Sequence, residues 1–230
     1  MNEPLRSYVY VREGRMIVWI GIVTIIAFVI GSIPFGVLLA KLFRLPDPRG
    51  IGSGNIGATN MLRTGHKGVA AFTLLLDALK GAIPVMIGGF IIGTVSYAAQ
   101  GIHQNPYAVN QGAAYALLIA LLAHCYTPWL KGKGGKGVAT ALGGSIIFSI
   151  YIAWPLSLAF CATWLLVFVF TRYVSLASIV ALLTLPVMAA ITLDPGTAIL
   201  FGLCAIISIW RHRSNIERLK LGTEPKMGRK

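Results

Sequence analysis

The chain has 230 residues, of which 56% are hydrophobic and 12% are charged, and its mean hydropathy is +0.76. Soluble domains carry about twice that share of charged residues, so the composition excludes a soluble globular domain and indicates a membrane protein. The net charge is +13, but the basic residues lie between apolar runs. That placement sets membrane topology or serves anionic ligands, and it does not indicate nucleic-acid binding.

Residues 1–15 form an arm that precedes the first apolar run. The arm contains Arg6, Arg12 and Arg15, and the run begins at Met16. The run is too long for a signal peptide and has no clear cleavage site, so we predict a retained first helix. We therefore expect an extracytoplasmic arm at 1–15 and a single membrane domain at 16–230.

Apolar runs of roughly 20 residues recur along the chain, and each can cross a hydrocarbon core of about 30 Å. We predict an all-α integral membrane protein built as a bundle of seven transmembrane helices. The predicted spans cover residues 17–42, 68–97, 113–130, 138–153, 156–170, 176–193 and 197–210. Only a bend at Trp154–Pro155 separates the fourth and fifth spans, so a single long hairpin is the alternative there.

The basic residues are distributed unevenly between the two sides of this predicted bundle. Sixteen of the twenty Lys and Arg residues lie in the first, third and fifth connections and in the C-terminal tail. The connections at 98–112, around 154 and at 194–196 carry none. The positive-inside rule then places the N-terminus outside and the C-terminus in the cytoplasm. All the polar motifs described below would emerge on the cytoplasmic face.

The first polar motif is GSGNIGATN, at residues 52–60. Its glycines allow sharp turns, and successive free N–H groups in such turns form an anion-binding concavity. Neutral donors and one guanidinium suited to phosphate accompany them: Ser53, Asn55, Thr59, Asn60 and Arg63. A flexible loop with a basic end is the alternative interpretation.

The second motif is LKGKGGKGVAT, at residues 130–140. It departs from the nucleotide-binding P-loop pattern because Val138 follows Gly137. Lysines, glycines and the start of a helix nevertheless favour a phosphate here. The alternative is an ordinary basic loop on the cytoplasmic side.

Two further polar segments follow, TRYVSLAS at 171–178 and WRHRSNIERLKLGTEPKMG at 210–228. Ser175 could cap the next helix. The last segment is typical of an amphipathic helix at the membrane surface, where His212 and Asn215 would share one face. An interfacial histidine without a chemical role is the alternative for His212.

Two charges lie inside a predicted span. Asp77 and Lys80 are three residues apart, so we expect them to pair on one face of the helix, turned to the bundle interior in support of a site. The three cysteines lie in apolar stretches, and we expect them to be buried small apolar residues. Their number and spacing indicate neither a metal site nor a disulfide framework.

Taken together, GSGNIGATN followed by Arg63, KGKGGKGVAT, SLAS and HRSNIERL with GTE resemble the bacterial membrane acyl-phosphate:glycerol-3-phosphate acyltransferases, the PlsY family. The resemblance covers residues 16–228 in motif order, spacing and shared membrane face. It implies a seven-helix enzyme of the bacterial cytoplasmic (inner) membrane, with its active site on the cytoplasmic face.

The implied reaction transfers a fatty acyl group from acyl phosphate to the 1-hydroxyl of glycerol 3-phosphate. The products are lysophosphatidic acid and inorganic phosphate, and a second membrane acyltransferase would act next. The partners implied are therefore glycerol 3-phosphate, a long-chain acyl phosphate and membrane lipid, with no metal, organic cofactor or nucleic acid.

The resemblance also assigns site residues. The catalytic residues would be Ser53, Arg63, His212 and Asn215. The substrate-binding residues would be Asn55, Thr59, Asn60, Lys133, Gly134, Gly135, Lys136, Ser175 and Glu224. The acyl chain would lie in a groove between helices that opens to the bilayer.

An acyl phosphate is already activated, so the enzyme mainly aligns the hydroxyl with the carbonyl and stabilises the oxyanion. We hypothesise that the phosphate of the donor takes the proton. His212 as general base and a covalent acyl-Ser53 intermediate are the alternatives.

Two other classes of function compete with an enzyme. A transporter of phosphorylated metabolites would fit the basic loops and the Asp77–Lys80 pair, but it predicts ligand access from both faces. A structural partner of other lipid enzymes gives no reason for loops rich in glycine, asparagine and lysine. The crowding of polar motifs on one face favours an interfacial enzyme.

Overall fold

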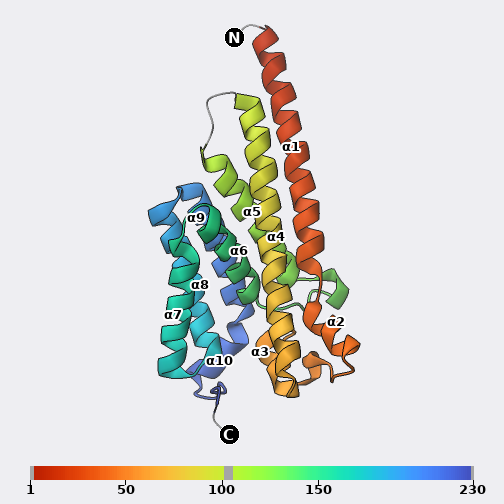
Figure 1. Cartoon of the computed structure of the whole chain (residues 1–230), viewed down its shortest axis with the longest axis vertical. Coiled ribbons are helices and arrows are strands. Elements are labelled where there is room, and N and C mark those ends of the chain that lie inside the picture. The colour runs from red at the N-terminus through yellow and green to blue at the C-terminus, as the bar shows by residue number, and fades with distance from the viewer. Residues whose placement is uncertain (1–2, 101–105, 229–230) are drawn as a thin grey trace.

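The computed structural model describes residues 3–100 and 106–228, and its regular elements there are all helices (Figure 1). The longer helices are α1 (Glu3–Ser32), α4 (Lys67–Gln100), α5 (Pro106–Cys125), α7 (Pro155–Thr171), α8 (Val174–Thr192) and α9 (Pro195–Arg211). The shorter helices are α2 (Phe35–Leu42), α3 (Ala58–Met61), α6 (Val138–Tyr151) and α10 (Arg213–Lys220). Three short 3-10 helices are η1 (Pro48–Gly50), η2 (Leu62–Thr64) and η3 (Pro128–Leu130).

The long helices run roughly along one axis in two groups. Helices α1, α4 and α5 pack on one another, and α7, α8 and α9 form the other side of the bundle (Figure 1). Helix α6 lies between the groups, in contact with both α4 and α7. Helices α2, α3 and α10 gather at the end opposite the start of α1 (Figure 1). The polar motifs of the sequence therefore meet at one end of the bundle.

Each predicted span contains a helix, but the helices differ in length. Among the described residues, four stretches are long and apolar enough to cross a membrane: Arg15–Ser32, Lys67–Ala98, Tyr107–Leu130 and Val174–Thr192. Helices α9 and α10 form a pair bent by 60°, which would count as a fifth span. Helices α6 and α7 are shorter, with 14 and 17 residues. The all-α architecture is confirmed for the described residues, and the seven crossings stay a prediction.

The first predicted span differs most from its helix. Helix α1 begins at Glu3, so residues 3–15 of the predicted arm continue the first helix, while residues 1–2 lie outside the described part. The span predicted at 17–42 is broken, because α1 ends at Ser32 and α2 begins after Pro34. Proline has no N–H for the helix ladder, and its ring clashes with the preceding turn.

A buried ion pair supplies a second hydrogen-bond donor to a backbone carbonyl at this break, that of Ile33, which also accepts from the N–H of Phe35. Lys80 on α4 donates from Nζ to the carbonyl oxygen of Ile33 at 2.9 Å and lies 2.7 Å from Oδ1 of Asp77. The Lys80 and Asp77 side chains are only 1% and 4% exposed. A lone charge at this depth would be costly, whereas each charge here has a partner. The predicted pairing inside the bundle is confirmed.

Small residues let α4 and α6 approach each other closely. A Cβ atom on Gly143 of α6 would lie 1.9 Å from the carbonyl oxygen of Ala78, and one on Gly81 of α4 would lie 2.0 Å from that of Thr140. Neither position has room for a side chain, as is usual where membrane helices pack tightly. The contact fixes the start of α6, and with it the lysine-rich loop, against α4.

Candidate active site

A cavity of about 650 Å³ lies among the motif-bearing segments. Segments far apart in the sequence line it, at 53–63, 136–142, 174–178 and 212–227, together with side chains of α4, α5 and α7. Ten of the thirteen predicted site residues are among its lining: Ser53, Asn55, Thr59, Asn60, Arg63, Lys136, Ser175, His212, Asn215 and Glu224. Their placement around one space is a fact of the fold, and their roles stay predictions.

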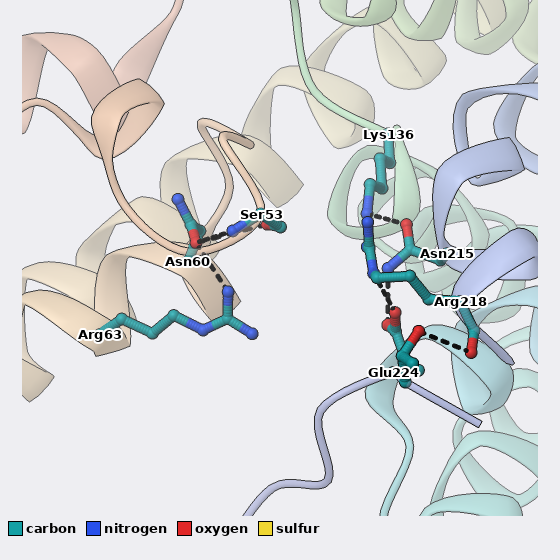
Figure 2. Close-up of polar contacts among 8 residues, drawn as sticks. Ser53, Asn60, Arg63, Lys136, Asn215, Arg218 and Glu224 are labelled. Carbon is teal, nitrogen blue, oxygen red and sulfur yellow. Dashed lines mark hydrogen bonds and ion pairs between the residues drawn. The ribbon is translucent and has the colours of Figure 1, made fainter. Parts of the chain in front are cut away.

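Asn60 organises the first wall of the cavity. Its side chain is nearly buried, and Nδ2 donates to the carbonyl oxygens of Pro48, Ile51 and Asn55 at 2.6, 3.0 and 2.8 Å. Its Oδ1 accepts from N and Oγ of Ser53 at 3.2 and 3.3 Å (Figure 2). One amide thus ties together a loop that has no regular ladder of its own, and it holds Ser53 at the cavity.

Arg63 lies beside this hub and is exposed to the cavity. Its Nη1 donates to Oδ1 of Asn60 at 3.3 Å (Figure 2). The guanidinium packs over Gly52, where a Cβ atom would lie 2.1 Å from Nη1, and Gly52 has a φ of +53°. Both the contact and the left-handed backbone favour glycine there. Among the described residues, the other N–H groups of Arg63 have no hydrogen-bond partner, so they could bind an anion in the cavity.

The opposite wall carries a chain of four polar side chains (Figure 2). Glu224 accepts a hydrogen bond from Nδ2 of Asn215 with Oε1, at 2.6 Å, and from Nε of Arg218 with Oε2, at 2.7 Å. Oδ1 of Asn215 accepts from Nζ of Lys136. Asn215 and Glu224 are buried. One buried carboxylate therefore positions two cations, one directly and one through an amide.

The charges on this wall are unbalanced toward positive. Burial lowers the pKa of Lys136 to about 8; the carboxylate of Glu224 opposes the shift, and the positive charges of Arg218, Arg211 and Arg63 add to it. Burial alone would raise the pKa of Glu224, but hydrogen bonds and the charge of Arg218 outweigh it and hold that pKa below its usual range. Such crowded cations are stabilised when an anion lies between them.

His212 lies between α9 and α10 and lines the cavity in its neutral form. Its Nδ1 lies 2.8 Å from the carbonyl oxygen of Ser208, so Nδ1 carries the hydrogen and Nε2 is left as an acceptor. Burial, followed by the charge of Lys136, lowers the pKa of His212 to about 4. Ser175, in the first turn of α8, is also buried and lines the same space.

Three predicted residues, Lys133, Gly134 and Gly135, lie outside the cavity lining. Lys133 is exposed. The N–H groups of Gly134 and Gly135 donate to carbonyl oxygens at the end of α5, and their own carbonyls accept from Arg211. A Cβ atom on Gly135 would lie 2.0 Å from Nε2 of His124. The two glycines let the loop pack on α5, which presents Lys136 to the cavity.

Several lining residues were not predicted as site residues: Asp77, His124, Arg218 and Lys226. His124 is 4% exposed, and its Nδ1 lies 3.9 Å from Oδ1 of Asp77. For Asp77 and His124, the signal available in the sequence was a polar residue inside an apolar run. Arg218 was hidden among the basic residues of the tail. Within the described ranges, no three His, Cys, Asp or Glu side chains are grouped so that they could hold a metal ion.

Part of the cavity lining is apolar. Leu142, Phe160 and Trp164 line it. Leu74 on α4 and Cys161 on α7 also line it, and both are exposed. The expectation that all three cysteines are buried is thus wrong for Cys161. Apolar side chains of α4, α6 and α7 therefore line the same cavity as the polar walls.

Comparison with known proteins identifies close relatives. The sequence model of the family described as "Glycerol-3-phosphate acyltransferase" matches residues 21–222. Glycerol-3-phosphate acyltransferase of Rhodopseudomonas palustris strain HaA2 is 43% identical over 206 residues, covering 90% of this chain and 94% of the relative. That of Mesorhizobium japonicum is 45% identical over 206 residues, covering 90% of this chain and 95% of the relative.

Two solved structures share the fold. The crystal structure of PlsY (YgiH), an integral membrane glycerol 3-phosphate acyltransferase in its glycerol 3-phosphate form, superposes with a TM-score of 0.75 and 34% identity. The match covers 91% of this chain and 96% of that chain. The lysophosphatidic acid form of PlsY superposes with a TM-score of 0.72 and 34% identity, covering 91% and 95%.

The role of Asn60 can be tested by substitution. Asn60→Ala would remove one hydrogen bond from each of the carbonyls of Pro48, Ile51 and Asn55. The first two carbonyls keep the N–H groups of Ile51 and Gly54 as donors, so we expect each lost bond to cost about 0.5–1.5 kcal/mol. We expect a lower melting temperature and faster amide hydrogen exchange across residues 48–57. Thr59→Ala, at an exposed neighbouring position, is the structural control. Unchanged exchange in the Asn60 variant would contradict the role of Asn60 as the hub of this loop.

Proposed function

The chain belongs to the glycerol-3-phosphate acyltransferase family, and we propose that it transfers a fatty acyl group from a long-chain acyl phosphate to the 1-hydroxyl of glycerol 3-phosphate. The products are lysophosphatidic acid and inorganic phosphate. Lysophosphatidic acid would then be the substrate of a second membrane acyltransferase. The solved PlsY structures in glycerol 3-phosphate and lysophosphatidic acid forms support the acceptor and the product.

The observation that carries the choice of an acyl phosphate donor is the shape and charge of the cavity. Both substrates would carry a phosphate, and the cavity has cationic groups on two opposite walls, Arg63 on one and Lys136 with Arg218 on the other. Its apolar part, at Phe160 and Trp164, suits the acyl chain. A donor that is itself a lipid would enter from the bilayer without a soluble carrier.

In the proposed reaction, the 1-hydroxyl oxygen of glycerol 3-phosphate attacks the carbonyl carbon of the acyl phosphate. The new C–O ester bond forms as the C–O bond to phosphate breaks, and the electron pair leaves with the phosphate. That phosphate takes the hydroxyl proton. The protein holds both anions in place and stabilises the oxyanion with fixed cations and donors.

Histidine is better suited to orient the hydroxyl than to remove its proton. With a pKa of about 4, His212 is a weak base that stays neutral at pH 7. Its Nε2 can accept a hydrogen bond from the attacking hydroxyl, because Nδ1 is held by Ser208. The leaving phosphate is next to the reacting carbon and is the more basic group.

Direct transfer is favoured over an acyl-enzyme intermediate on Ser53. A serine nucleophile needs a base within hydrogen-bond distance of its Oγ. In the part of the chain that the structure describes, the side-chain partner of that Oγ is the amide oxygen of Asn60, at 3.3 Å, which cannot take a proton. Ser53 is therefore assigned to substrate binding.

The proposed topology has seven crossings, with the start of α1 outside and the active site on the cytoplasmic face of the bacterial inner membrane. The positions of the basic residues support this orientation, because the loops of the site carry them. At 1.5 Å per residue, α6 and α7 span about 21 and 26 Å, so flanking residues or local thinning of the bilayer complete their crossings.

The reaction can be tested with purified protein and palmitoyl phosphate. We expect phosphate release that depends on glycerol 3-phosphate and equals the lysophosphatidic acid formed. Lys136→Ala removes a charged contact to phosphate, and we expect kcat/KM to fall about 10- to 100-fold. Ser53→Ala should also lower it. Lys131→Ala, at an exposed position in the same loop, is the matched control. A folded protein without acceptor-dependent release would overturn the proposed function.

The pKa of Lys136 gives a pH dependence. Protonated Lys136 binds phosphate, so kcat/KM for glycerol 3-phosphate should be maintained below pH 8 and fall above it, because the pKa is about 8. In Lys136→Arg, which stays charged up to about pH 12, the alkaline fall should disappear. Steady-state kinetics from about pH 6 to about pH 10 measure this dependence of kcat/KM on pH. If kcat/KM fell with the same midpoint pH in the wild type and in Lys136→Arg, the fall would come from the titration of another group.

The topology can be tested by thiol labelling. Lys133→Cys and Trp154→Cys, both at exposed positions, are each placed in a Cys161→Ser background. A membrane-impermeant maleimide added to right-side-out vesicles should label the thiol at position 154 at once and that at 133 only after permeabilisation. Labelling of 133 from outside would reverse the orientation, and an inaccessible 154 would mean that α6 and α7 form a re-entrant hairpin.

A further inference from the structure

Three arginines near the break between α9 and α10 have different surroundings. Arg211 donates from Nε and Nη2 to the carbonyl oxygens of Gly135 and Gly134, so it holds the lysine loop. Arg213 is exposed, and its guanidinium lies over the ring of Trp210, 5.5 Å from its centroid. Arg218 alone of the three lines the cavity. We propose that Arg218 is a further substrate-contacting residue, which binds the phosphate group of one substrate through its two Nη atoms.

Glu224 fixes the orientation of the Arg218 guanidinium through its Nε atom. Its Nε donates to Oε2 of Glu224 at 2.7 Å, and the other oxygen of that buried carboxylate is held by Asn215. Within residues 3–100 and 106–228, neither Nη atom of Arg218 has a hydrogen-bond partner. The side chain is 33% exposed. A guanidinium has five N–H donors, so four remain for a ligand in the cavity.

Arg218 also adds positive charge to the part of the cavity that Lys136 lines. It lies on the same wall as Lys136, and Glu224 holds both through the polar chain (Figure 2). The nearness of the two cations contributes to the lowered pKa of Lys136. A purely structural ion pair would cancel its own charge, whereas Glu224 here is shared between two cations. A net positive charge thus remains facing the cavity.

The ligand chemistry is that of a phosphate with several anionic oxygens. The paired Nη atoms form a planar fork that matches two such oxygens, which a lysine ammonium cannot do. Both substrates of the proposed reaction carry such a group, so the inference rests on the proposed function. The acceptor and the donor are the two possible sources, and separate kinetics with each distinguish them.

The first test compares Arg218→Gln, Arg218→Lys and Arg213→Gln in the palmitoyl phosphate assay. For Arg218→Gln we expect KM for one phosphorylated substrate to rise about 10- to 100-fold, with a smaller change in kcat. Arg218→Lys keeps a partner for Glu224 but loses the fork, so the same KM should rise without loss of thermal stability. Arg213→Gln, on the same helix but outside the cavity, should match wild type.

The second test needs no variant. Phenylglyoxal reacts with the two Nη atoms of arginine, and mass spectrometry of the labelled wild type gives the rate at each site. Glycerol 3-phosphate or inorganic phosphate should slow labelling of Arg218 several-fold and leave Arg213 unchanged.

The outcomes separate this inference from the proposed function. An inactive wild type would overturn the acyltransferase reaction itself. An active wild type whose Arg218 labels at the same rate with and without phosphate ligands would overturn the inference. So would Arg218 variants that lose stability and kcat while both KM values stay unchanged, because that pattern describes an arginine that only supports Glu224.

Discussion

The buried contact between Lys80 and Asp77 connects the break in the first helix to the active site. Lys80 donates a hydrogen bond to the carbonyl oxygen of Ile33, and its partner Asp77 lies beside His124. The ring of His124 in turn lies behind Gly135, so the lysine loop rests on it. In an apolar bundle each of these groups requires a polar neighbour, since lipid offers none. The helix break, the ion pair and the lysine-rich loop are therefore parts of one polar arrangement.

Glu224 connects distant segments in a similar way, on the cavity wall that carries Lys136 and Arg218. It reaches the cavity because the chain folds back after α10, where the N–H groups of Thr223 and Glu224 donate to the carbonyl oxygen of Arg218. A carboxylate is unfavourable by charge alone in the two-phosphate site that we propose. It is tolerated because both its oxygens are occupied by Asn215 and Arg218, and it presents cations, not itself, to the ligand.

The sequence was sufficient to predict a helix in each span and to name ten residues that line one cavity, because apolar run length and motif position depend on local chemistry. It was not sufficient for contacts between distant segments. The bond between Lys136 and Asn215 joins positions 79 residues apart, and it exists only after α6 and α10 are packed. The carbonyl partners of Asn60 depend on the course of an irregular loop. Arg218 could not be distinguished by composition from the other basic residues of the tail.

The exposed positions of Leu74 and Cys161 on the cavity lining have a consequence for the proposed lipid donor. Since both residues line the cavity and are exposed, the proposed acyl phosphate donor would reach the site by lateral diffusion within one leaflet. The effective concentration of this donor would then be its mole fraction in the membrane, not its amount per volume of aqueous solution. Added neutral lipid or detergent would compete by surface dilution alone, and the soluble acceptor would be the only reactant that obeys ordinary bulk kinetics.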